Sequence, residues 1–273
     1  MSYLRACRVT RLSGMKILLL GFGSIGRHIV RLLNHDFTAM VRDIDAHRER
    51  GTLGVHLITE SQFDEALANA DLVVEAAGVE AAKQFLPRAH KPFVLTSVGA
   101  LADPEIADAL MTPHLHVTNG AIGGLDILEA VAEQLDDISI TTSKDPTGLV
   151  QPWMNQDEVT RLEALTEPET LFEGNPIDAI EKFPGNVNVA VALAYATRGS
   201  HAMSEALRKV QVRLVADPLH PESAHVIDAS GDAGRFRFEF VAAPSPINPA
   251  TSGTTALSLA ATIRRIAPSV RRN

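Results

Sequence analysis

The sequence predicts an α/β protein with a doubly wound parallel sheet, followed by a second α+β domain with a mainly antiparallel sheet. Three observations carry this prediction. Apolar strand-like runs alternate with helix-like segments over residues 15–120. A glycine-rich turn joins the first strand to the first helix, and period-two strand patterns appear after residue 125. Regular alternation of strands and helices is typical of parallel sheets with helices on both faces.

The glycine-rich turn occupies residues 21–26, GFGSIG, directly after the apolar run of residues 17–20. Gly21 allows the tight turn, Gly23 lets a pyrophosphate approach the backbone, and Gly26 allows close packing of helix on strand. The helix that follows offers free N–H groups and a positive dipole end to phosphates. We therefore expect a Rossmann-type dinucleotide site, with a purely structural glycine turn as the alternative. The expected contacts are Gly21, Gly23, Ser24, Ile25 and Gly26.

The remaining elements of the first domain follow in order. Further strands are expected at residues 37–41, 54–57, 71–77, 92–97 and 115–118. Helices are expected between them at residues 61–70, 79–89 and 103–111, and Ser61 is the expected N-cap of the first. These elements define a dinucleotide-binding domain over residues 15–124, preceded by a flexible extension of residues 1–14.

The pattern changes over residues 125–250, the expected catalytic and dimerisation domain. Helices are expected at residues 125–135 and 186–197, and residues 145–170 are expected to form a loop with one short helix. Strands are expected at residues 138–142, 210–215, 225–229 and 235–240. A final amphipathic helix starts at residue 251, and we expect residues 251–268 to pack back on the first domain.

Composition limits the function. The 273 residues are 45% apolar and carry a net charge of −8, which argues against a general nucleic-acid or anionic-membrane binder. Cys7 is the single cysteine, so no internal disulfide framework is possible, and the cytoplasm is the expected compartment. No apolar stretch is long enough to span a bilayer, and the first residues do not form a secretory signal.

Asp43 lies about twenty residues beyond the glycine turn, where an acidic side chain binds the adenosine ribose in dinucleotide sites. A solvated loop aspartate is the alternative interpretation, and Asp45 competes for the role. Arg42 is adjacent and suits a 2′-phosphate. The choice between NAD and NADP therefore stays open.

Other loops follow strands and are expected to line the cofactor, because ligands bind at the carboxyl ends of parallel strands. Ala77 and Gly78 form one such corner, and residues 97–100 form a second. The segment of residues 119–126, NGAIGGLD, precedes the second domain, where either a nicotinamide contact or a hinge is expected. The segment FPGNVNVA, residues 183–190, contains two asparagines at the start of the helix expected at residues 186–197. One is expected to cap this helix, and the other, Asn188, is expected to face a ligand.

His225 is the candidate acid or base. It begins a strand of the second domain, and a histidine in a nicotinamide cleft titrates near working pH, since its ordinary pKa is about 6.5. A structural histidine is the alternative. No two histidines stand at i and i+4 with a carboxylate in a zinc-like arrangement, so a metal site is not expected.

These segments together resemble the L-aspartate dehydrogenase family, from residue 15 to the C-terminal helix. Residues 171–194 are the most specific part of the match. The resemblance implies a homodimer that oxidises L-aspartate to iminoaspartate with NAD or NADP; the product feeds NAD biosynthesis or hydrolyses to oxaloacetate. By position, His225 matches the catalytic histidine of the family, and Ala121 and Asn188 match cofactor-binding positions. The motifs that carry the resemblance are GFGSIG, DLVVEAAG, SVGALAD, NGAIGGLD, TTSKDP, LFEGNPIDAIEKFPGNVNVAVALA, ADP before His225, and PSPINPATS.

The chain departs from the family at Asn119, at Asn175-Pro176 and in the longer segment of residues 198–209. These departures bear on the choice of substrate. The two carboxylates of aspartate need cationic or N–H partners, for which we select Lys144, with Thr251 and Ser252 in support. Another two-domain reductase of an imine or hydroxy acid, and a non-catalytic dinucleotide sensor, are the alternative functions.

Overall fold

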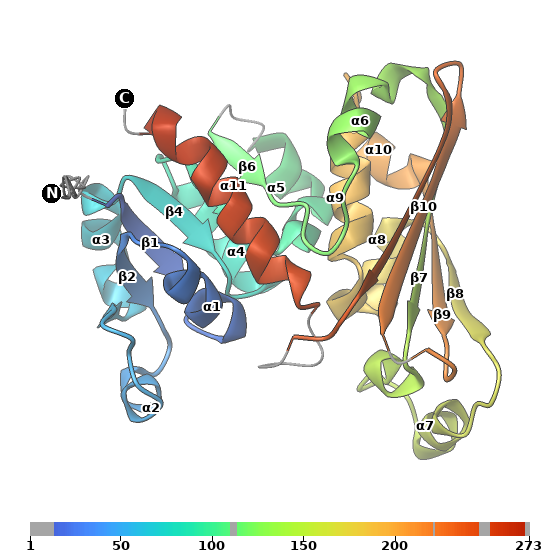
Figure 1. The fold of residues 1–273 in the computed structure, drawn as a ribbon, viewed down its shortest axis with the longest axis horizontal. Helices are drawn as coiled ribbons and strands as arrows, with labels where there is room; N and C mark the ends of the chain where they lie inside the picture. Colours follow the sequence, from blue (N-terminus) through green and yellow to red (C-terminus); the bar gives the residue numbers. More distant parts are fainter. Residues whose placement is uncertain (1–13, 110–113, 221, 246–251, 271–273) are drawn as a thin grey trace, which may run out of the picture.

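The computed structural model describes residues 14–109, 114–220, 222–245 and 252–270, which form two sheets joined by helices (Figure 1). The first sheet has six parallel strands in the order β3-β2-β1-β4-β5-β6. This order reverses between β1 and β4, which confirms the doubly wound fold expected from the sequence. The strands are β1 (Lys16–Leu20), β2 (Asp36–Met40), β3 (His56–Ile58), β4 (Leu72–Glu75), β5 (Phe93–Leu95) and β6 (Leu115–Val117).

Helices cover both faces of this sheet. They are α1 (Ser24–Leu32), α2 (Ile44–Glu49), α3 (Phe63–Asn69), α4 (Val79–Phe85) and α5 (Pro104–Ala109), with 3₁₀ turns η1 (Glu60–Gln62), η2 (Leu86–Arg88) and η3 (Val98–Ala102). The helix nearest the C-terminus, α11 (Thr254–Val270), lies beside α1 and across the first sheet (Figure 1). Leu259 and Ile263 of α11 are fully buried in one cluster with Ile17, Leu19 and Ile29. The last helix of the chain therefore completes the core of the first sheet.

The second sheet has five strands in the order β11-β10-β7-β9-β8. β7 and β9 run parallel and every other neighbouring pair is antiparallel, so the sheet is mainly antiparallel, as expected. The strands are β7 (Leu135–Lys144), β8 (Glu169–Gly174), β9 (Val210–Ala216), β10 (Ser223–Gly231) and β11 (Gly234–Ala242).

Four helices lie between the two sheets, on one face of the second (Figure 1). They are α6 (Leu125–Ala130), α8 (Pro176–Lys182), α9 (Asn188–Ala196) and α10 (Met203–Lys209), while α7 (Gln156–Glu163) lies beyond the end of the sheet. Short 3₁₀ turns occur at η4 (Ala132–Gln134), η5 (Pro146–Leu149) and η6 (Pro184–Asn186). Along β9, buried Val210, Val212 and Leu214 alternate with more exposed residues, because only one face of this sheet is covered by helices.

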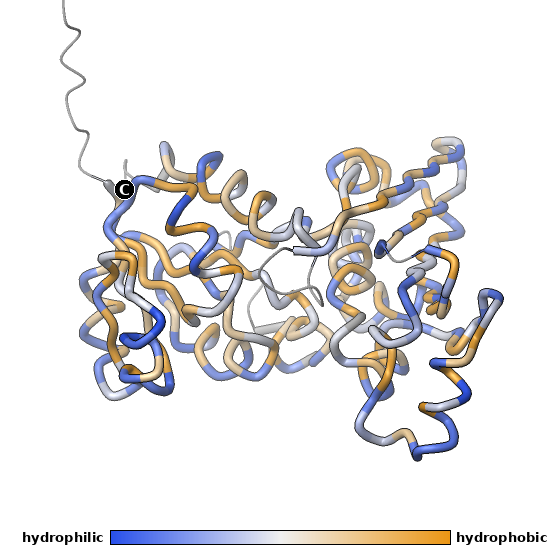
Figure 2. The backbone as a smooth tube through the Cα atoms, turned by 60° about the horizontal axis from the view of Figure 1, so that its bottom comes forward, coloured by the Kyte–Doolittle hydropathy of each residue, from blue (hydrophilic) through white to orange (hydrophobic). Residues whose placement is uncertain are grey.

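The first sheet lacks such alternation because helices cover both of its faces. Four of the five residues of β1 and all four of β4 are buried. In Figure 2 the strands of this sheet are mostly orange, the colour of apolar residues. Among the described residues, no helix has the length and apolar character that a membrane crossing requires.

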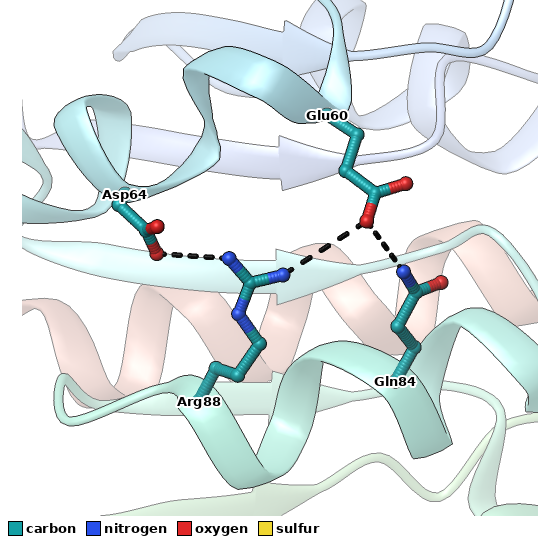
Figure 3. Close-up of polar contacts among 4 residues, drawn as sticks. All are labelled: Glu60, Asp64, Gln84 and Arg88. Carbon is teal, nitrogen blue, oxygen red and sulfur yellow. Dashed lines mark hydrogen bonds and ion pairs between the residues drawn. The ribbon is translucent and has the colours of Figure 1, made fainter.

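An exposed polar network joins the region around α3 to α4 and η2 (Figure 3). Arg88 lies between Asp64 and Glu60, at nitrogen–oxygen distances of 2.9 and 3.9 Å, and the Gln84 amide donates to Glu60 over 2.6 Å. The Arg88 guanidinium also stacks over Phe63, 4.5 Å from the ring centroid. Exposed ion pairs stabilise a fold by less than about 1 kcal/mol each. The contact between Arg88 and the Phe63 ring therefore contributes more to stability than either ion pair of Arg88.

Several local expectations were wrong. The expected N-cap at Ser61 is replaced by Thr59, which forms a capping box with Gln62 at the start of η1. The third strand begins at His56 rather than residue 54, because Leu53 and Gly54 have φ of 54° and 79° and turn the chain. No asparagine side chain caps α9: Val187 occupies the N-cap position. Strand β8 and helices α8 and α10 were not expected.

Candidate active site

A cavity of about 200 Å³ lies where the carboxyl edge of the first sheet meets the second sheet. Three parts of the chain line it. The first sheet contributes Ile25, Thr96, Ser97, Thr118, Asn119 and Ala121; the region of the second contributes Lys144, Asn188, Ser223 and His225; the start of α11 contributes Ser252 and Thr255. The cavity thus brings together six residues selected from the sequence: Ile25, Ala121, Lys144, Asn188, His225 and Ser252. Thr251, also selected, lies outside the described residues.

The glycine turn has the geometry of a phosphate cradle. Gly21 has a φ of 91°, and a Cβ there would lie 2.7 Å from the carbonyl oxygen of Ala76. A Cβ on Gly26 would lie 2.5 Å from the carbonyl oxygen of Gly21, so α1 packs too closely on β1 for any side chain. A Cβ on Gly23 would meet nothing within 4 Å, which leaves the backbone open at the N-terminus of α1. These residues fit a dinucleotide pyrophosphate.

Asp43 is exposed directly after β2 and acts as the N-cap of α2, accepting from the backbone N–H of Ala46 over 2.9 Å. Its competitor Asp45 pairs with Arg48 over 3.1 Å on the surface of that helix. Asp43 therefore keeps its place as the candidate for the ribose, although it is not among the cavity residues. Capping one helix uses one carboxylate oxygen and leaves the other for a ligand.

His225 is 4% exposed on β10, directly opposite Thr142 of β7. Its Nδ1 lies 2.9 Å from the Thr142 hydroxyl. Burial, together with the charge of Lys144, lowers the pKa of His225 from 6.5 to about 4. The expectation of an ordinary pKa near neutrality was therefore wrong, because the ring is removed from water and faces a cation.

Lys144 ends β7 and lines the same cavity. Burial lowers the pKa of its ammonium group. The Lys144 side chain is half-buried rather than exposed. A desolvated ammonium attracts an anion more strongly than an exposed one does.

Asn188 begins α9, and its side-chain oxygen accepts from the backbone N–H of Gly99 in η3 over 2.8 Å. This bond ties α9 to the turn that follows β5. The amide nitrogen is left as the donor that a ligand in the cavity can use.

The departures from the family pattern fall in different places. Asn119 lines the cavity. Asn175 caps α8, accepting from the N–H groups of Ile177 and Asp178, and Pro176 takes the first helical position. Asn175 and Pro176 are not cavity residues. The segment of residues 198–209 forms a turn followed by α10.

Besides several cavity residues, sequence reasoning missed Glu75 and Thr142, which support the site without lining the cavity. Glu75 is fully buried at the end of β4 and accepts from the N–H groups of Ala77 and Gly78 over 2.7 and 2.8 Å. A carboxylate that ends an otherwise apolar strand is the signal that would have identified it. Thr142 gave no such signal, because a threonine in an alternating strand is ordinary.

A doubly wound sheet with a glycine cradle, beside a cleft that contains a buried histidine and a lysine, defines a dinucleotide-dependent oxidoreductase. Comparisons with known proteins agree. Residues 3–88 match the NAD-binding domain of D-isomer-specific 2-hydroxyacid dehydrogenases, and residues 126–266 match the family model "Aspartate dehydrogenase, C-terminal".

Individual relatives extend the match to almost the whole chain. The L-aspartate dehydrogenase of Methanopyrus kandleri is 38% identical over 78% of each chain. That of Methanosarcina mazei is 31% identical over 92% of this chain and 97% of its own. The aspartate dehydrogenase structure from Thermotoga maritima superposes with a TM-score of 0.70 at 25% identity, covering 94% and 96% of the two chains. The chain belongs to the aspartate dehydrogenase family.

Proposed function

We propose that this protein oxidises L-aspartate to iminoaspartate with NAD or NADP. Family membership supports this reaction, and one structural observation carries it. His225, Lys144 and Asn188 line the same cavity as Ile25 of the glycine turn, so catalytic and cofactor-binding groups meet in one place. Iminoaspartate then hydrolyses to oxaloacetate and ammonia, or feeds NAD biosynthesis.

The cofactor would be held by residues of the cavity and by others beside it. Gly21, Gly23, Ser24, Ile25 and Gly26 would hold the pyrophosphate, and Asp43 the ribose. Ala77, Gly78, Ala121 and Asn188 would contact the nicotinamide half. When bound, the nicotinamide accepts the hydride that leaves Cα of aspartate.

Substrate binding depends on charge. Lys144 binds one carboxylate of aspartate, and the hydroxyl of Ser252, with Thr251 beside it in the sequence, supports the second. A half-buried ammonium is suited to this task, since its attraction for a carboxylate is weakly screened. The same carboxylates, being negative, oppose the lowering of the His225 pKa by the charge of Lys144.

His225 handles the proton. Its low pKa keeps the ring neutral at neutral pH, so one ring nitrogen is free to accept a proton from the substrate ammonium. The Thr142 hydroxyl on Nδ1 fixes the ring orientation. Two bound carboxylates raise the pKa of His225, which brings proton acceptance closer to working pH.

The reaction is tested by NADH and NADPH formation with a panel of L-amino acids and hydroxy acids. We expect activity with L-aspartate alone. We expect His225→Asn to retain NADH binding, measured by fluorescence, and to lower kcat by about 10²–10⁴-fold. Turnover of another substrate in place of aspartate, or wild-type kcat in the variant, would contradict the proposal.

The proposal extends to the organisation of the protein. Residues 15–124 with α11 form the dinucleotide-binding domain, and residues 125–250 form the catalytic and dimerisation domain. The protein acts as a homodimer, as the family resemblance implies, and its single cysteine favours the cytoplasm as its compartment. Light scattering after size-exclusion chromatography tests the dimer, which a mass of 29.3 kDa for the eluting species would contradict.

A further inference from the structure

Glu75 receives five hydrogen bonds in the interior of the protein. Its exposed fraction is 0%. Oε1 accepts from the N–H groups of Ala77 and Gly78 over 2.7 and 2.8 Å and from the Ser97 hydroxyl over 2.9 Å. Oε2 accepts from the N–H groups of Thr96 and Ser97 over 3.2 and 2.8 Å. The carboxylate thereby ties the loop after β4 to the loop after β5.

The five partners are all neutral donors. Among the described residues, no lysine, arginine or histidine forms an ion pair with Glu75. Because each contact donates to the carboxylate and none accepts from it, the group serves only as an acceptor, as an ionised carboxylate does. A negative charge is therefore buried here, and within the described part of the chain no positive side chain forms an ion pair with it. Such a charge acts on its surroundings with little screening by solvent.

The position of this charge matters. β4 and β1 are neighbours in the sheet, and the order of strands reverses between them. Dinucleotides bind in the crevice outside the carboxyl ends of strands at this point. Thr96 and Ser97 line the cavity that contains His225. A dinucleotide whose pyrophosphate lies at Gly21–Gly26 must extend across the two loops that Glu75 holds to bring its nicotinamide to His225.

We propose that Glu75 is a positioning residue that fixes the two nicotinamide-facing loops and, through its buried charge, favours the oxidised cofactor over the reduced one. The inference rests on the proposed use of NAD or NADP, not on the identity of the substrate. The oxidised nicotinamide ring carries a positive charge, and the reduced ring is neutral. A fixed negative charge nearby therefore stabilises only the oxidised form by direct attraction.

The charge and the loop contacts are separated by two substitutions. Glu75→Gln removes the charge and keeps the size of the side chain. Ser97→Ala removes one of the five donors and keeps the charge. Dissociation constants for the oxidised and reduced cofactor are measured without aspartate, by calorimetry and by NADH fluorescence, with ADP-ribose as a ligand that lacks the ring.

We expect Glu75→Gln to raise the ratio of the dissociation constants, oxidised over reduced, by about tenfold, because the loss of a buried unit charge, which solvent screens little, weakens the binding of the oxidised form alone. The affinity for ADP-ribose should change less than the affinity for the oxidised or the reduced cofactor. Ser97→Ala should weaken both cofactor forms equally and leave the ratio unchanged. A misplaced loop alone weakens both forms, so the ratio distinguishes a charge effect from a structural one.

An unchanged ratio in a folded Glu75→Gln protein overturns the proposal. If Glu75→Gln fails to fold, the test uses Ser97→Ala and Glu75→Asp, which both keep the charge. These variants must weaken binding of the oxidised and the reduced cofactor without altering the ratio of the dissociation constants. An altered ratio overturns the proposal equally. A wrong substrate assignment leaves these measurements unaffected, whereas absence of NAD(P) binding by the wild-type protein refutes the cofactor itself.

Discussion

The low pKa of His225 predicts that the folded protein loses stability in acid, and that His225→Asn removes this loss. Asparagine keeps a polar atom near Thr142 but has no group that titrates. The histidine pKa is about 4 in the folded protein and 6.5 when solvated. Between these values the unfolded chain binds a proton that the folded chain excludes, so stability falls as the pH is lowered from 6.5 to 4.

The size of the loss follows from the two pKa values. At pH 5 the unfolded histidine is almost fully protonated and the folded one mostly neutral, which favours unfolding by about 30-fold, or about 2 kcal/mol, relative to pH 8. At pH 4 the loss approaches about 3 kcal/mol. In the variant this contribution is zero, and only the remaining titrating groups act.

Urea unfolding at pH 8, 6 and 5 measures the difference. Trp153 is the single tryptophan and lies beside Phe183 in the region of the second sheet, with its indole N–H bonded to the carbonyl oxygen of Lys182. Its fluorescence therefore reports the unfolding of the part that holds His225. We expect the stability difference between wild type and variant to shift by about 2 kcal/mol between pH 8 and pH 5.

His201→Asn makes the same substitution at an exposed position of the same region and serves as the control. Parallel curves for wild type and His225→Asn would refute the reasoning. That result would mean that the ring is protonated in the folded protein and that a carboxylate or water compensates its burial.

Two further predictions concern glycines, each with a matched control. Gly26→Ala should lower stability by about 1–3 kcal/mol in thermal unfolding, because its Cβ would lie 2.5 Å from the carbonyl oxygen of Gly21. Gly23→Ala is the control: it should fold normally and lose NADH affinity in a fluorescence titration. Normal stability of Gly26→Ala would contradict the close packing of α1. Gly124→Ala should lower the free energy of unfolding by about 2 kcal/mol or more, because its φ is 70° and its Cβ would lie 2.6 Å from the Phe238 ring. Gly120→Ala is the control, with a φ of 61° and no neighbour within 4 Å, and should lower it by about 1 kcal/mol in urea unfolding. Equal losses would show that packing against Phe238 is unimportant.

The first sheet was predictable because its strands have both faces covered and therefore appear as continuous apolar runs between helices of period 3.6. The glycine turn was predictable for a similar reason, since each glycine meets a local steric demand. Strand β8 was not predictable, because it contains Glu169 at a half-buried position and Glu173 at an exposed one. Glu169 pairs with Arg161 of α7, and Glu173 pairs with Arg213 of β9. Helix α8 was missed because its cap, Asn175, follows a strand that was itself missed.

For the candidate site, residue types were predictable and their environments were not. His225 and Lys144 were selected from the sequence, but the lowered pKa of each depends on burial between elements more than eighty residues apart. Glu75 was passed over because its five donors come from two loops that only the folded sheet brings together. Tertiary hydrogen bonds of this kind leave no local periodicity to detect.

The return of α11 to the first sheet has a consequence for how the chain folds during synthesis. Strand β1 buries one face against Leu259 and Ile263, which are translated long after it. A nascent chain therefore cannot complete the core of the cofactor-binding half until α11 has left the ribosome. Chains truncated within α11 would expose the apolar residues of β1 and α1 to solvent, and such chains become targets for chaperones and proteases. Only chains that contain α11 therefore acquire a finished dinucleotide fold.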